Sequence, residues 1–484
     1  MSGSERHAAV ARVASVVASV VASVVVPVVV VPVVVAACAF ALAACASEDI
    51  DLPETIACDP TSGPAELFAD QQVLCVDLDL AESDFDQLRR QSKFGPRRDS
   101  DLLGEVFGHL LRDCHTPYPN RYDIFAADLE LMGMDVPEIG VRKKGFLGSV
   151  IGLGMHKPSL KVQTDRFAAD QSIDERTRLT LNNNVQDRGR VATCLSYHIF
   201  ALAGYPAPLC TMANVMIRGR SLGAYSNVES LERPFLRRVF GNDDGSLYEG
   251  TVADFTPANI AGFSDQHLAR FEAKTALSDP SGAPLVALTD ALGADDDELL
   301  AALEPVLDLD RFFTFWALER LIAHEDGYAG NRNNYYIYFD PARGGRGVFI
   351  PWGPDHSLRD DVLLGEDNRD FATGELTRRL SRLAEGRARL EAELRRLVTE
   401  VWDAEALVAR AERYADQVRS AEVADDEFED EIAELREWLR ARPAAITAEL
   451  DEGGIAAGAD QPLPCPDREL AEALLALFSV LVLL

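Results

Sequence analysis

The sequence predicts an α+β protein with a β-rich N-terminal part and a mainly helical C-terminal part. Between residues 73 and 167, several short segments alternate apolar and polar side chains, which is the pattern of half-buried strands. Beyond residue 258, apolar side chains recur at i, i+3 and i+4 spacing, as they do on amphipathic helices. The chain has 484 residues, of which 47% are hydrophobic, so it is long enough for two or three folded domains.

The N-terminus has the pattern of a secretory signal. Arg6 and Arg12 precede a long run rich in Val and Ala that ends at Cys45. The tetrapeptide LAAC at Leu42–Cys45 resembles the lipobox of bacterial lipoproteins, in which the cysteine is acylated, and VAAC at Val35–Cys38 is a second candidate. An uncleaved transmembrane anchor is the alternative, because the run approaches the roughly 20 residues that span a bilayer. Both interpretations predict that the rest of the chain is exported.

Composition predicts five regions along the chain. Residues 1–45 form the signal, and residues 46–70 form an acidic, Pro-containing tether. A β-rich lobe follows at 71–250, and a helical lobe with a polar hairpin at 251–455. The tail at 456–484 contains an apolar segment that is short for a spanning helix.

Export changes the interpretation of the cysteines. Without Cys38 and Cys45, six of the eight remain, an even number in an oxidising compartment, so disulfides are expected. Six cysteines allow 15 pairings, and the sequence does not choose among them. The six are Cys58, Cys75, Cys114, Cys194, Cys210 and Cys465. Cys194 lies in an apolar helical pattern, where a buried free thiol is the alternative.

The first part of the chain contains four predicted strands and one helix. The strands are expected at 73–80, 122–133, 136–145 and 160–167, where apolar and polar residues alternate. An amphipathic helix is expected at 83–91, between the first two strands.

In the middle of the chain, the spacing of the apolar residues changes from that of strands to that of a helix. An apolar helical stripe starts at Val191 and ends at Gly204 and Pro206, which is a stop signal. A hairpin that turns at Arg218–Arg220 follows. Further helices are expected at 309–327 and throughout 376–450, the latter with charged faces.

Charge and motifs exclude two classes of function. The formal net charge of −32 argues against a nucleic-acid partner, because a phosphate backbone requires a basic surface. Ser221 and Ser226 lie in no GxSxG elbow, so a serine hydrolase has little support.

The segment HEDGYAGN carries the strongest chemical signal. Asp326 lies two residues after His324 and five before Asn331, which is the HxDxxxxN spacing of a protein-kinase catalytic loop. In that loop the Asp faces the substrate hydroxyl, while the Asn turns back to a magnesium ion that bridges nucleotide phosphates. A second carboxylate must arrive from the far side of a hairpin to hold the metal, and Asp355 has that position.

The surrounding sequence resembles the CotH kinase family, which is named for a bacterial spore-coat protein. The segments that carry the resemblance are NRNNYYIYFD, GVFIPWGPDHSL, LNNNVQDRGR, YPAP, GAYSNVE and FGNDDGSLYEG. It covers roughly Val73 to Leu450. The resemblance implies an atypical secreted protein kinase with a two-lobed kinase-like fold, a mixed β N-terminal lobe that binds nucleotide and a mainly helical C-terminal lobe.

The resemblance also implies roles for the residues of the hairpin. The enzyme would use ATP and a divalent metal, Mg²⁺ or else Mn²⁺ or Ca²⁺, to phosphorylate Ser or Thr hydroxyls of a protein substrate. Asp326 would be the catalytic aspartate, with His324 in the same motif. Asn331 and Asp355 would hold the metal, with Asn334 or its neighbour Asn333 as alternates.

Three residues upstream are implied as nucleotide-binding. Lys161, or else Lys157, would approach the phosphates from the strand KPSLKVQTDRF, and Glu229 matches a family glutamate near the nucleotide pocket. The chain departs from the family at Gly353, where PWDxD has become PWGPD. It also departs where the family has an Arg-Glu pair and this chain has Ala192–Thr193.

The predicted location is that of a membrane-anchored lipoprotein. Lipidated Cys45 would attach the chain to a membrane, and Ala46 after it favours the outer membrane or cell surface. A pseudokinase that serves as a surface-bound structural or interaction module is the alternative function.

Overall fold

The computed structural model describes residues 66–70, 72–93, 95–96, 120–145, 156–256, 271–275, 278–279, 281–360 and 370–458. The expected signal with Cys45, most of the expected tether, residues 146–155 and most of the C-terminal tail lie outside these residues. Helices and sheets are both present, so the α+β class is confirmed. In the described part of the chain, no helix is long and apolar enough to span a membrane.

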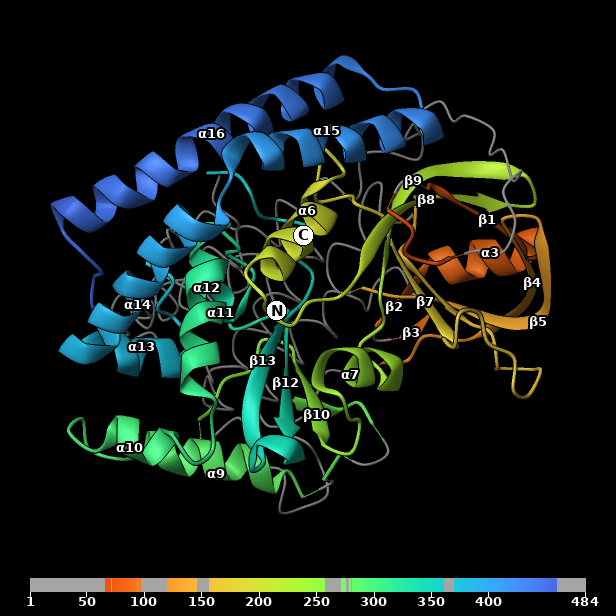
Figure 1. Ribbon diagram of the computed structural model, residues 1–484. Helices are drawn as coiled ribbons and strands as arrows, with labels where there is room; N and C mark the ends of the chain where they lie inside the picture. The colour runs from red at the N-terminus through yellow and green to blue at the C-terminus, as the bar shows by residue number, and fades with distance from the viewer. Residues whose placement is uncertain are drawn as a thin grey trace, which may run out of the picture. The chain divides into compact units, whose positions relative to one another are not determined.

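The β-rich part is a closed barrel (Figure 1). Its strands, in the order in which they pair, are β1 (Leu74–Asp79), β4 (Phe125–Leu131), β5 (Met134–Lys143), β6 (Leu160–Gln163), β7 (Arg178–Asn182), β9 (Arg220–Val228) and β8 (Cys210–Ile217). β1 closes the ring because it pairs antiparallel with β4 and parallel with β8. Alternation buries every second side chain of β4 and β6 in one apolar core.

A second sheet carries the polar hairpin. Its order is β11 (Phe271–Ala273), β10 (Ser246–Gly250), β12 (Tyr335–Asp340) and β13 (Arg346–Pro351). β12 and β13 form the antiparallel hairpin that the sequence predicts, with Tyr335 opposite Pro351. A small ladder of β2 (Gln91–Ser92) and β3 (Gly95–Pro96) is separate from both sheets.

The helices follow the apolar spacing of the sequence. They are α3 (Glu82–Arg89), α6 (Ala192–Leu202), α7 (Arg233–Phe240), α9 (Ala283–Leu292), α10 (Leu299–Leu303), α11 (Leu309–Leu321), α12 (Tyr328–Asn331), α13 (Glu375–Arg382), α14 (Ala384–Arg396), α15 (Ala404–Ala421) and α16 (Asp426–Glu452). A 3₁₀ turn at Pro341–Arg343 and a π turn at Leu397–Val401 complete the set among the described residues. α11 packs against β13 and α14, and α15 lies beside α16 (Figure 1).

Most predicted elements are confirmed. Strands occur in each of the four segments predicted at the N-terminal end, and α3 lies between β1 and β4. α6 ends before Gly204, whose φ of 68° is favourable for glycine. The hairpin of β8 and β9 turns at Arg218 and Gly219, which both have positive φ.

The disulfide expectation is confirmed for one pair. Cys194 of α6 is bonded to Cys210 at the start of β8, so the alternative of a free thiol at Cys194 is wrong. Cys75 is also disulfide-bonded. The Cys194–Cys210 bond ties α6 to the barrel. The same helix contacts the loop that follows β13.

Candidate active site

The HEDGYAGN segment forms a tight loop between α11 and β12. Glu319 near the end of α11 accepts the N–H of Tyr328 at 2.9 Å and that of Ala329 at 2.8 Å. These two bonds turn the chain back on itself and start the short helix α12. Asp326 therefore lies just before α12, and Asn331 lies at its last residue.

Three asparagine side chains surround the Asp326 carboxylate. The Nδ2 of Asn331 donates to Oδ1 at 2.7 Å, and the Nδ2 of Asn334 donates to Oδ2 at 2.6 Å. Asn333 lies 3.2 Å from both oxygens and also accepts the Val252 N–H through its own Oδ1. The structure thus brings together Asp326 and all three asparagines that the sequence singles out.

The Asp326 carboxyl has a perturbed proton affinity. Burial raises its pKa to about 6, and the negative charge of Asp355 acts in the same direction. The amide groups of the asparagines oppose this shift, because they donate hydrogen bonds to the ionised form. Asp326 and Asp355 are therefore close enough to interact electrostatically.

Asp355 is positioned by the loop that follows β13. The hydroxyl of Tyr197 on α6 accepts the N–H of Gly353 at 3.0 Å, and the Ser196 hydroxyl is 2.8 Å from that of Ser357. Burial raises the pKa of Asp355, while the positive charge of Lys144 and a hydrogen bond from Asn182 lower it. α6 and the barrel thus hold this carboxylate from two sides.

A basic face of the barrel adjoins Asp355. Arg142 and Lys161 are direct partners across β5 and β6, and Lys144 follows two residues after Arg142, so all three share one face. The Lys144 Nζ lies 3.5 Å from Asn182 Oδ1 and 6.0 Å from the ring centre of Trp352. Burial lowers the pKa of Lys144 to about 8, although Asp355 opposes that shift.

Lys161 faces a second group of charges on the sheet. Burial lowers its pKa to about 8, and the charges of Lys274 and Arg142 add to the effect. Lys274 forms ion pairs with Glu249 and with Glu272, the latter at 2.8 Å. Although burial opposes it, the positive charges of Lys274 and Lys93 lower the pKa of Glu249 to about 2. Cations outnumber anions here, as expected of a surface that receives a polyanion.

Two other predicted residues have different partners in the described part of the chain. Lys157 is buried, forms an ion pair with Glu422 at 3.5 Å and lies 5.1 Å from the ring centre of Tyr225. Glu229 is buried between Arg176, at 3.0 Å, and Arg238. The structure therefore does not bring these two residues to Asp326, and their nucleotide role stays a prediction.

His324 is buried behind the loop. Its Nε2 lies 3.2 Å from the carbonyl oxygen of Trp352, to which it donates, and burial lowers its pKa to about 4. A neutral imidazole in this position joins the start of the Asp326 loop to the end of β13. Its catalytic role stays a prediction.

The donor set is suited to a hard divalent cation. Within the described ranges, no three or more His, Cys, Asp or Glu side chains are arranged to hold a metal. A metal would therefore be held by Asp355 and by asparagine amide oxygens, with the Asp326 carboxylate close enough to add its negative charge. All these donors are oxygen ligands of the kind Mg²⁺ prefers, and a cation would offset the repulsion between the carboxylates.

Sequence reasoning missed Lys144, Asn182 and Tyr197. Lys144 and Asn182 were detectable in part, because the period of two along β5 and β7 places polar side chains on one face. Tyr197 left no signal, because it lies within an apolar helical stripe and its role depends on tertiary packing.

Comparison with known proteins identifies similar sequences. A family model described as CotH kinase protein matches residues 148–449, a region that contains Asp326 and Asp355. The chain is 25% identical over 218 residues to Invasin CotH2 of Rhizopus delemar, which is 42% of this chain and 36% of that protein. It is 26% identical over 217 residues to Invasin CotH3 of the same organism, covering 42% and 35%. The chain thus spans about a third of the length of these curated relatives.

Proposed function

Since the chain belongs to the CotH kinase family, we propose that it is a metal-dependent protein kinase that transfers the γ-phosphoryl group of ATP to Ser or Thr hydroxyls of exported proteins. The barrel would be the nucleotide-binding lobe of a two-lobed kinase-like fold, and the helical part would be the second lobe. The proposal is supported above all by the Asp326 carboxylate, which three asparagine amides hold and whose pKa is raised in part by the charge of Asp355. The basic face of β5 and β6 adds the cations that phosphates require.

Each group has a defined task in the proposed transfer. The substrate hydroxyl oxygen bonds to the γ-phosphorus as the bond to the β-phosphate oxygen breaks, so that ADP leaves. Asp326 accepts the hydroxyl proton, for which a pKa of about 6 is suitable near neutral pH. ATP supplies the phosphoryl group, and a divalent cation supplies neutralising charge.

The remaining residues of the site would bind the cation and orient the nucleotide phosphates. Asp355 and Asn331 would hold the cation, with Asn334 or Asn333 as alternates. Lys144 and Arg142 join Lys161 as cations that face the phosphates, because they share its strand face. Lys157 and Glu229 would support the nucleotide lobe through their own ion pairs.

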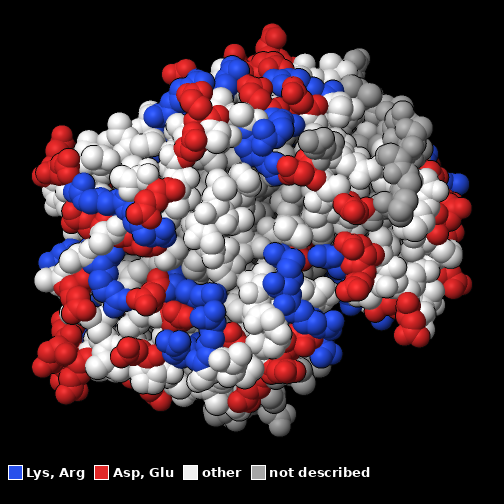
Figure 2. Space-filling view, viewed as in Figure 1, with Lys and Arg blue, Asp and Glu red and all other residues white. Residues whose placement is uncertain are grey.

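The N-terminal signal and the names of the relatives support a proposed place of action. The names of the relatives describe invasins, and the leader of this chain predicts export with Cys45 as a lipid anchor. We therefore propose a surface-exposed lipoprotein that acts on exported proteins. On the face drawn in Figure 2, acidic and basic side chains lie in small interspersed groups. The net charge of the whole chain is −32, which disfavours nucleic acid as the substrate.

A pseudokinase is the second candidate, and one position favours it. Gly353 replaces an acid of the family motif and has a φ of 52°. A site with one carboxylate fewer neutralises less of a metal's charge, so this candidate predicts no magnesium-dependent nucleotide binding.

Transfer of label distinguishes the two candidates. The full chain is incubated with Mg²⁺, ATP labelled at the γ-phosphate and a generic Ser/Thr-rich acceptor such as casein. The kinase predicts label in the acceptor that is lost in Asp326→Asn, with Asp340→Asn as a control at the far end of β12. Label that persists in Asp326→Asn, or an absence of transfer by the wild type, contradicts the proposed kinase.

A further inference from the structure

We infer that Glu319 is a positioning residue for Asp326: it fixes the loop that carries the carboxylate and does not itself touch the substrate. The inference rests on the proposed function, because it names a residue on which the geometry of that site depends. It concerns a side chain on α11 that lies outside the sequence motif.

Both carboxyl oxygens of Glu319 accept hydrogen bonds from the backbone of the loop. Oε1 accepts the N–H of Tyr328 and Oε2 accepts that of Ala329, so two consecutive backbone donors are fixed. The N–H of His324 is in turn bonded at 2.8 Å to the backbone carbonyl of Glu319. Residues on both sides of Asp326 are therefore tied to one residue of a rigid helix.

The fit around this carboxylate is close. A Cβ on Gly327 would lie 2.2 Å from Glu319 Oε1, and one on Gly330 would lie 2.1 Å from the Glu325 carbonyl oxygen. Glycine at position 327 is thus required for the approach of the loop to α11, and glycine at position 330 for the close packing of α12 on Glu325 within the loop. A displacement of Glu319 would be transmitted directly to Asp326, which precedes Gly327.

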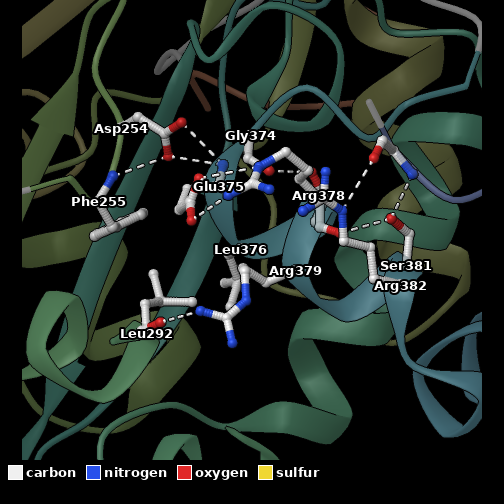
Figure 3. A network of polar contacts seen from close by, with 12 residues as sticks. Asp254, Phe255, Leu292, Gly374, Glu375, Leu376, Arg378, Arg379, Ser381 and Arg382 are labelled. Carbon is white, nitrogen blue, oxygen red and sulfur yellow. Dashed lines mark hydrogen bonds and ion pairs between the residues drawn. The ribbon is translucent and has the colours of Figure 1, made fainter. Parts of the chain in front are cut away.

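The opposite side of α12 is held independently. Thr373 donates from its N–H and its hydroxyl to the carbonyls of Ala329 and Gly330 at 2.6 to 3.0 Å. Figure 3 shows Asp254 at the start of α13, where it accepts the N–H groups of Phe255 and Glu375. The same carboxylate accepts the Tyr328 hydroxyl at 3.0 Å. Because α12 stays anchored on this side, loss of the Glu319 contacts would shift the Asp326 end and leave the fold intact.

Burial of a carboxylate is a costly way to build a turn. Glu319 is fully buried, and burial raises its pKa to about 8 despite the two backbone donors. Both oxygens of this side chain accept backbone N–H groups, which an apolar side chain of similar size would leave without a partner there. The placement of the loop matters because an error of about 1 Å can lower a rate on the order of 100-fold.

Glu319→Gln tests the inference, because it preserves the shape and replaces one acceptor with a donor. Three quantities are measured: hydrogen exchange at the Tyr328 and Ala329 amides, Mn²⁺ affinity, and kcat and KM for ATP. The matched control is Asp340→Asn, which removes a buried carboxylate that accepts the Ala342 N–H at 3.0 Å in the far turn of the hairpin.

In Glu319→Gln we expect faster hydrogen exchange at the Tyr328 and Ala329 amides. Its Mn²⁺ affinity and kcat should fall on the order of tenfold or more, while its KM for ATP should stay within about twofold of the wild-type value. Asp340→Asn should lower the free energy of unfolding but leave Mn²⁺ affinity, kcat and KM as in the wild type. If Glu319→Gln keeps both its Mn²⁺ affinity and its kcat, the inference is overturned and Glu319 is only structural.

Failure of the proposed function is recognised separately. A wild type that binds Mn²⁺ but transfers no phosphate refutes the kinase, and the inference is then decided by Mn²⁺ affinity alone. A wild type that binds no Mn²⁺ overturns both. Should Glu319→Gln fail to fold, Gly327→Ala disturbs the same oxygen from the loop side, and the same losses are expected of it.

Discussion

Burial and then the negative charge of Asp355 raise the pKa of Asp326, although the two side chains lie at opposite ends of the segment that contains the β12–β13 hairpin. The first carboxylate is fixed by a loop from α11, and the second is fixed by Tyr197 of α6 and by the barrel. Two like charges held close together by independent elements favour a bound cation between them.

The stability of the ligand-free protein should depend on the ionisation of Asp326. Its folded pKa of about 6 exceeds the ordinary value of 3.8, so the folded state holds this proton more tightly than the unfolded state does. The resulting stabilisation is complete below pH 3.8 and is lost as the pH rises through about 6. Urea unfolding of wild type and Asp326→Asn from pH 4 to pH 7 should show the wild type losing stability relative to the variant. A constant difference would contradict the shifted pKa.

Gly353→Asp should strengthen metal binding. The substitution restores the family's acid beside Asp355, and aspartate tolerates the left-handed φ of 52° better than most residues. Its Cβ would lie 3.0 to 3.2 Å from the Asn334 side chain, which must shift slightly. Gly353→Asn is the matched control, because it imposes the same strain without the charge. Isothermal titration with Mg²⁺ should show tighter binding in the Asp variant alone, and equal binding in both would refute the carboxylate argument.

Tyr197→Phe should loosen the loop that carries Asp355. It removes the acceptor of the part-buried Gly353 N–H, which costs on the order of 1 kcal/mol. We expect a lower free energy of unfolding and weaker Mn²⁺ binding. Tyr248→Phe makes the same chemical change at a hydroxyl that donates to the Asp279 carbonyl at 2.6 Å, and should leave Mn²⁺ affinity unchanged. Equal Mn²⁺ affinities in the two variants would show that Tyr197 does not position Asp355.

Lys144→Met should weaken ATP binding more than Lys157→Met does. Lys144 adjoins Asp355, whereas Lys157 is occupied by Glu422. Loss of one charged contact to a phosphate is expected to lower affinity on the order of tenfold. Fluorescence titration with a labelled ATP analogue measures both variants, with Lys161→Met for comparison. A larger loss of affinity for the ATP analogue in Lys157→Met would show that Lys157, and not Lys144, contacts the phosphates.

The residues around Asp326 were predictable because they are local in sequence. Asn331, Asn333 and Asn334 lie within eight positions of Asp326, and a loop between a helix and a strand brings such residues together. The hairpin was equally predictable from its alternating aromatic strand and the Gly344–Gly345 turn, where both φ values are positive.

The rest of the site depends on long-range packing. Lys144 and Asp355 are far apart in the chain and become neighbours only through the closure of the barrel and the packing of α6. The sequence favoured Lys161 over Lys157, although both lie near the start of β6. Their burial differs because Lys157 precedes the strand and pairs with Glu422 beyond α15. The strands β7 and β10 were not predicted from the sequence.

The most direct measurement is a crystal structure with Mn²⁺ and a non-hydrolysable ATP analogue, with the metal identified by its anomalous signal. We expect one Mn²⁺ held by Asp355 and Asn331 beside the phosphates, with Asp326 facing the γ-phosphate and Lys144 contacting a phosphate oxygen. Asp326 and Asp355 pointing apart, with no metal between them, would contradict this expectation.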